Sequence, residues 1–151
     1  MNNKYILVVD DEKAILMGFK AVLEMTGYRV STAQDGGDAI DLVCEHFFNL
    51  AIIDIKLPDM EGTELLKEFQ TINPLMKKII ITGYASLENA IESLNLGADG
   101  YLLKPVMPGK LLEVVANKLY EQEMENEQNE EMVRDLLDAR RREDYGLDKW
   151  A

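Results

Sequence analysis

The chain has 151 residues, of which 47% are hydrophobic, so it can form one domain with a sizeable core and some additional length. Its formal net charge of −12 argues against nucleic acid as a partner, because a polyanion would be repelled. The single cysteine, Cys44, excludes an internal disulfide and suggests a reducing compartment.

The chain begins with a short apolar stretch that is followed by two aspartates. Tyr5–Val9 is too short for a signal peptide or a membrane-spanning segment. We therefore expect a cytoplasmic protein with no membrane partner.

Short apolar runs alternate with helix-period segments over the first 120 residues. The apolar runs predict strands over Lys4–Val9, Tyr28–Thr32, Leu50–Ile53, Lys78–Thr82 and Gly100–Leu103. The segments between and after them predict helices over Glu12–Met25, Asp38–Phe48, residues 63–72, residues 86–96 and from Pro108 onward. Five such βα units indicate an α/β fold, a right-handed, doubly wound parallel sheet with five helices.

Asp54 ends the third apolar run, which is the centre of the functional argument. Leu50–Ile53 are apolar without alternation, as is typical of a strand buried on both faces of a parallel sheet. Ligands bind at the carboxyl ends of such strands. An isolated aspartate here would usually cap a turn, but other segments bring matching groups to the same edge.

Two acids, a hydroxyl and an ammonium follow the neighbouring strands. Asp10 and Asp11 follow the first strand, Thr82 closes the fourth and Lys104 follows the fifth. Crowded carboxylates repel one another unless they share a cation, and Mg²⁺ binds carboxylates while leaving positions for water and a phosphoryl oxygen. The combination predicts phosphoryl transfer onto Asp54, where positioning and charge stabilisation do most of the catalysis.

These residues and their spacing resemble the receiver domain of two-component response regulators, with its chemotaxis-regulator-like fold. The resemblance covers residues 4–120. The matching stretches are Val8–Glu12, Ile53–Gly62, Ile81–Gly83 and Gly97–Pro105. It implies the strand order 2-1-3-4-5, which is a common order for doubly wound sheets of this kind.

The resemblance also implies a role for each matching residue of the metal site. Asp54 would be the phosphoacceptor and a metal ligand. Asp11 would ligate Mg²⁺ directly, Asp10 would help through the shell of the metal, and the backbone carbonyl of Lys56 would complete the protein ligands. The phosphoryl donor would be a histidine kinase or a phosphotransfer protein.

The resemblance also implies which residues respond to phosphorylation. Lys104 would pair with the phosphoryl group, its peptide bond to Pro105 would be cis, Thr82 would move to hydrogen-bond the phosphoryl group, and Tyr101 would swing inward. Gly83 would leave room beside Thr82. The expected enzymology is limited to transfer onto Asp54 and loss of that phosphate.

The side chains of Lys56 and Tyr84 are placed by the resemblance over the approach of water to the phosphoryl group. Both side chains are long or bulky. We therefore expect a phosphorylated state that is long-lived for the family.

Two other classes of protein share parts of this pattern. A phosphatase with an aspartate nucleophile usually has a second aspartate two residues later, where this chain has Lys56. A flavin-binding module needs a loop rich in hydroxyls and glycines after the first strand, where Asp10, Asp11 and Glu12 would repel phosphate. The phosphatase remains a remote alternative.

The composition changes after residue 120, which predicts a receiver domain over 1–120 and an acidic helical extension over 121–151. Residues 121–131 hold six glutamates and no basic residue. Residues 132–145 then read as a short amphipathic helix. Thirty-one residues are too few for an output domain, so we expect either a regulator that acts by protein contact or the front of a longer transcriptional regulator.

The expected output surface is formed by the helix over residues 86–96, the strand Gly100–Leu103 and the helix from Pro108. Thr82 and Tyr101 flank this surface, so phosphorylation could bias its packing. We expect a weak or phosphorylation-dependent homodimer there, helped by the extension. The main alternative is an extension folded back on its own domain.

Overall fold

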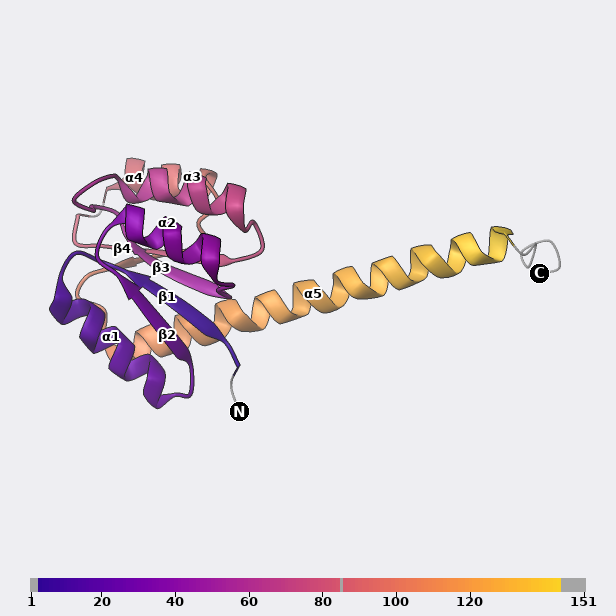
Figure 1. Ribbon diagram of the computed structural model, residues 1–151, viewed down its shortest axis with the longest axis horizontal. Coiled ribbons are helices and arrows are strands. Elements are labelled where there is room, and N and C mark those ends of the chain that lie inside the picture. Colours follow the sequence, from indigo (N-terminus) through magenta and orange to yellow (C-terminus); the bar gives the residue numbers. More distant parts are fainter. Residues whose placement is uncertain (1–2, 85, 145–151) are drawn as a thin grey trace. The chain divides into compact units, whose positions relative to one another are not determined.

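The computed structural model describes residues 3–84 and 86–144. Within these residues one parallel sheet has the strand order β2-β1-β3-β4-β5 (Figure 1). The strands are β1 (Tyr5–Val9), β2 (Arg29–Ala33), β3 (Leu50–Asp54), β4 (Lys77–Thr82) and β5 (Gly100–Leu103). The helices are α1 (Lys13–Met25), α2 (Gly36–Glu45), α3 (Gly62–Ile72), α4 (Leu87–Asn95) and α5 (Pro108–Asp144). The predicted fold class and strand order are confirmed.

The sheet is buried on both faces, which explains the uninterrupted apolar runs of its central strands. In β3, Ala51 and Ile53 belong to one buried cluster, together with side chains of α2 and α3. Leu50 and Ile52 belong to the other cluster, with side chains of α1 and the first turns of α5. Figure 1 shows this layering, with α2 and α3 on one side of the sheet and α1 on the other.

Three predicted helix ends are confirmed by their backbone or capping geometry. Gly27 and Gly97 follow α1 and α4 with φ of 98° and 99°, a conformation that costs glycine little. The Ser86 hydroxyl caps α4 by accepting a hydrogen bond from the Asn89 amide at 3.0 Å.

The second helix is shorter than its predicted range of Asp38–Phe48. It begins at Gly36, after Asp35 caps it, and ends at Glu45. Its predicted last residue lies outside the helix, where Phe48 is fully buried and packs against the Tyr5 ring at 4.5 Å between centroids. The chain leaves the helix at His46, whose backbone is extended, and this places the Phe48 ring in the core, where its burial is stabilising.

The chain divides into two compact units, Met1–Leu119 and Tyr120–Ala151. The first contains the sheet, and α5 runs from the first into the second. No helix in the described ranges 3–84 and 86–144 combines the length and apolarity needed to cross a membrane.

Candidate functional site

The predicted site residues lie at the carboxyl ends of neighbouring strands. The pairing of Val9 with Ile53, and of Asp54 with Ile81, puts the ends of β1, β3 and β4 at the same edge of the sheet. Asp10, Asp54 and Thr82 are buried there, with exposures of 3%, 7% and 0%.

The Lys104 side chain joins two of these carboxylates. Its Nζ donates to Asp10 Oδ2 at 2.8 Å and to Asp54 Oδ2 at 3.0 Å. Burial would lower the pKa of this ammonium, but its hydrogen bonds to Asp10 and Asp54 outweigh that effect and raise the pKa. Lys104 is therefore a firmly charged cation placed between two acids.

Asp10 is a buried carboxylate within this cluster. Burial raises the pKa of its carboxyl, while the hydrogen bond from Lys104 opposes the shift. Its second oxygen, Oδ1, accepts a hydrogen bond from the Glu12 amide at 2.9 Å. Both oxygens of this buried carboxylate are thus held in place by the protein.

Of the two predicted switch residues, Thr82 contacts the backbone of Lys104, and Tyr101 lies on β5. The Thr82 hydroxyl accepts a hydrogen bond from the Tyr84 amide at 2.9 Å. The backbone carbonyl of Thr82 accepts one from the Lys104 amide at 2.8 Å. The Tyr101 hydroxyl is buried and has no hydrogen-bond partner among the described residues. The Lys104–Pro105 peptide bond is cis, which confirms that prediction.

Carboxylate oxygens of Asp10, Asp11 and Glu12 lie within 4.8 Å of one another. Asp11 and Glu12 are exposed, so a cation could reach them from solvent. An all-oxygen, anionic donor set suits a hard ion such as Mg²⁺. Glu12 is a further candidate ligand that the sequence analysis did not name, and its position directly after two aspartates was the signal for it.

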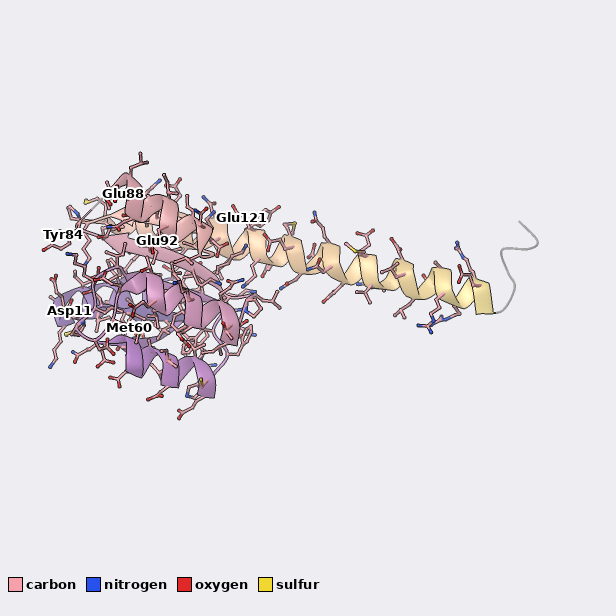
Figure 2. The ribbon with its side chains drawn as sticks, turned by 90° about the horizontal axis from the view of Figure 1, so that it is seen from above. Asp11, Met60, Tyr84, Glu88, Glu92 and Glu121 are labelled. Carbon is pink, nitrogen blue, oxygen red and sulfur yellow. The ribbon has the colours of Figure 1, made fainter. Side chains whose placement is uncertain are left out.

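A cleft of about 480 Å³ opens over the phosphoacceptor candidate. It is lined by Asp11, Glu12, Asp54, Lys56, Gly83, Tyr84 and Lys104. Across it, Lys56 Nζ lies 4.5 Å from the centroid of the Tyr84 ring, in a cation–π contact. Figure 2 shows Asp11 and Tyr84 at the same end of the sheet domain.

Comparison with known families decides what this arrangement belongs to. Residues 6–116 match the family model of the response regulator receiver domain. The chain belongs to this family. It is a receiver domain of two-component signalling, a module that is typically not an enzyme. Receiver domains bind Mg²⁺ and interact with histidine kinases.

Relatives with solved structures share the receiver fold. A receiver domain (CheY-like) from Methanospirillum hungatei is 55% identical, with a TM-score of 0.81 over 82% of this chain and 99% of that one. The beryllofluoride-activated NtrC4 receiver domain, solved as a dimer, is 30% identical, with a TM-score of 0.75 over 78% of this chain and 98% of that one.

The curated relatives are longer proteins. The transcriptional regulatory protein ZraR of Klebsiella oxytoca is 42% identical over 106 residues, which cover 70% of this chain and 24% of ZraR. AlgB of Pseudomonas putida, an alginate biosynthesis transcriptional regulatory protein, is 35% identical over 78% of this chain and 26% of AlgB. The receiver chain thus spans about a quarter of the length of these relatives.

The loop that follows Asp54 in this receiver is tied to helix α2. The Asp59 carboxylate accepts hydrogen bonds from the amides of Gly36 and Gly37 at 2.8 and 2.9 Å. These hydrogen bonds lower the pKa of Asp59. A side chain at position 36 would overlap Met60, which packs over this glycine.

The sequence analysis missed this tie. Asp59 lies 23 residues from Gly36, and no local pattern connects the two segments. The only signal was the Gly36-Gly37 pair just before the predicted helix Asp38–Phe48.

Both ends of this loop lie close to Asp54, the phosphoacceptor candidate. The Lys56 amide donates to Asp54 Oδ1 at 3.3 Å, and the Gly62 amide donates to the Ile55 carbonyl at 2.6 Å. A Cβ atom at Gly62 would lie 2.5 Å from the Asp54 carbonyl oxygen. Only glycine therefore fits the start of α3 without displacing the backbone of the site.

Proposed function

We propose that this receiver accepts a phosphoryl group on Asp54 from a phosphohistidine of a histidine kinase or a phosphotransfer protein. A carboxylate oxygen of Asp54 attacks the phosphorus, an O–P bond forms, and the N–P bond of the phosphohistidine breaks. The observation that carries the proposal is the Lys104 ammonium, 3.0 Å from the carboxylate that would be modified. A cation at this distance can pair with the charge of the transferred group.

We infer that Mg²⁺ is held by Asp10, Asp11, Asp54 and the backbone carbonyl of Lys56, with Glu12 near enough to contribute. When bound, the ion neutralises charge on the transferring phosphoryl group. The residues of the protein orient the acceptor: Lys104 and the Lys56 amide hold the two Asp54 oxygens at 3.0 and 3.3 Å. Their contacts fix the carboxylate before the donor arrives.

The proposed output is a change of protein contacts. The Thr82 hydroxyl, which now accepts from the Tyr84 amide, would turn to donate to the phosphoryl group. Tyr101 would respond from β5 and alter the α4, β5 and α5 surface. In this proposal residues 1–120 receive the signal and residues 121–151 form a helical extension. The alternative is that this chain is the receiver part of a longer transcriptional regulator. ZraR and AlgB are transcriptional regulatory proteins by name.

Phosphorylation by a small donor tests the assignment without the cognate kinase. Incubation with acetyl phosphate and Mg²⁺ should add one phosphoryl group to the full chain, as measured by intact-protein mass spectrometry. Asp54→Asn should add none, and removal of Mg²⁺ with a chelator should abolish labelling of the unmodified protein.

Asp41→Asn is the matched control, because Asp41 is an exposed aspartate on α2. It should be labelled like the unmodified protein. Persistent labelling of Asp54→Asn would show that another residue accepts the group.

A further inference from the structure

The C-terminal part of α5 carries an apolar patch that is exposed in the structure. Its members are Met132, Val133, Leu136 and Leu137, with exposures of 53–63%. Residues at these spacings lie on one side of a helix. A patch of this kind on an otherwise polar helix is typical of a surface that binds a partner.

The charges on the two sides of the patch differ. Residues 121–131 contain six glutamates and no basic residue, whereas the segment after the patch, residues 138–144, contains three arginines (Arg140, Arg141 and Arg142) and three acidic residues. One further arginine, Arg134, is already within 3.6 Å of Glu130 on the same helix. The partner surface that fits best is therefore basic before the patch and has acidic groups level with the three arginines after it.

A second copy of this helix presents such a partner surface only when it runs antiparallel to the first copy. In a parallel pair the glutamate-rich segments would face each other, and so would the three arginines, and like charges destabilise such pairs. In an antiparallel pair the arginine segment of each copy faces the glutamate-rich segment of the other.

An antiparallel register also matches the apolar residues. With the two-fold axis between residues 134 and 135, Val133 lies level with Leu136 of the second copy, and Met132 with its Leu137. The same register brings Arg142 level with Glu127 of the second copy. Such a self-complementary arrangement is what two-fold symmetry requires, because each contact then occurs twice.

We infer that the C-terminal helix binds a second copy of itself in antiparallel orientation, through Met132, Val133, Leu136 and Leu137. Four side chains per copy form a patch well below the area of a standard stable interface. The pair is therefore weak and forms at high protein concentration, or when another contact between the copies raises the effective concentration of the helices.

Directional disulfide trapping in the full chain tests the orientation. Cys44→Ser first removes the single cysteine, which is exposed. Asn129 and Arg140 extend the seam of Val133 and Leu136 at spacings of three and four residues, and the antiparallel register places them level with each other. Under mild oxidation, a mixture of Asn129→Cys and Arg140→Cys chains should give a mixed disulfide dimer, and either variant alone should give little.

Two helix variants show whether the patch drives this association. Added to the trapping pair, Leu136→Gln should remove most of the mixed disulfide. Asp138→Gln, a change on the opposite side of the helix, should leave it, and circular dichroism should show equal helix content in both.

Three results would overturn the inference. A disulfide formed by Asn129→Cys alone, in excess of the mixed product, would show a parallel pair. Equal trapping in Leu136→Gln and Asp138→Gln would show random collision. A monomer at high micromolar concentration in sedimentation equilibrium, without trapping, would show that the patch binds its own domain or another protein.

Discussion

At the scale of single residues, the site combines a fixed cation with a partly closed entrance. Lys104 is held by two carboxylates, so its ammonium is in place before any phosphoryl group arrives. Lys56 and Tyr84 contact each other across the mouth of the same cleft. We expect the first contact to favour the proposed transfer onto Asp54, and the second to restrict the path by which water could reach the phosphorylated product.

We predict that shortening both entrance residues speeds loss of phosphate. In Lys56→Ala/Tyr84→Ala the cation–π contact is gone and water has a wider approach to the acyl phosphate, so the phosphorylated state should decay severalfold faster. The measurement is the first-order decay of labelled protein after removal of acetyl phosphate.

A double variant of the same residue types elsewhere, Lys67→Ala/Tyr120→Ala, is the control, because both side chains are exposed. It should decay at the unmodified rate. An unchanged or slower rate in the entrance variant would reject the prediction.

We predict that Asp59 helps to hold the metal-binding loop. Asp59→Ala removes two hydrogen bonds to α2, and the loop that carries the Lys56 carbonyl becomes less ordered. Loss of such a supporting contact typically weakens metal binding by about tenfold. Isothermal titration with Mg²⁺ measures the change.

The control is Asp35→Ala, which removes the cap of the same helix but not the tie to the loop. Equal weakening in both variants would show that the effect comes from α2 alone. Because the pKa of Asp59 is lowered in the folded protein, the stability from this tie is present at neutral pH and is lost as pH falls through the lowered pKa.

At the scale of secondary structure, α4 is the least buried helix of the sheet domain. Among its residues Leu87–Asn95, only Ser93 is buried, while Leu87, Ile91 and Leu94 are exposed by 49–77%. A helix with so few buried contacts can change its packing at low cost. It is therefore suited to respond to a new hydrogen bond made by Thr82, which ends the neighbouring strand β4.

We predict a phosphorylation-dependent homodimer that uses this apolar stripe. Analytical ultracentrifugation of the full chain should show more dimer with beryllium fluoride than without it. Leu87→Gln/Ile91→Gln should reduce the dimer of the activated protein, because the exposed apolar surface on α4 is removed.

Glu88→Gln is the matched control on the same helix, and Figure 2 marks its position. It changes one charge and leaves the stripe intact. A monomer in both states at high micromolar concentration would contradict the prediction.

At the scale of the whole molecule, the charge separates this chain from proteins that bind nucleic acid directly. The net charge is −12, and the one cluster of basic residues, Arg140–Arg142, is followed by Glu143 and Asp144. We predict no binding of this chain to duplex DNA. An electrophoretic shift assay at low salt is the most permissive measurement, since electrostatic binding is strongest there. A salt-sensitive shift would overturn the prediction.

The sequence by itself determined the elements, their order along the chain and the type of site. Apolar runs such as Leu50–Ile53 act locally, because a strand with no polar face must be covered on both sides. Asp10, Asp54, Thr82 and Lys104 each end or follow such a run, and parallel strands bring their ends together. The placement of these four groups at one sheet edge therefore follows from periodicity alone, and their named roles from the family resemblance.

Only the tertiary structure decided which groups touch. It placed Lys104 between Asp10 and Asp54, Lys56 over the Tyr84 ring, and Asp59 on the amides of Gly36 and Gly37. It also moved Phe48 out of its predicted helix and into the core. These contacts join segments that are distant in sequence, and their geometry depends on loop conformation and on packing against the whole core. A local sequence pattern predicts neither the loop conformation nor the packing, because hydrophobic spacing specifies which face of an element is buried but not which distant side chain packs against it.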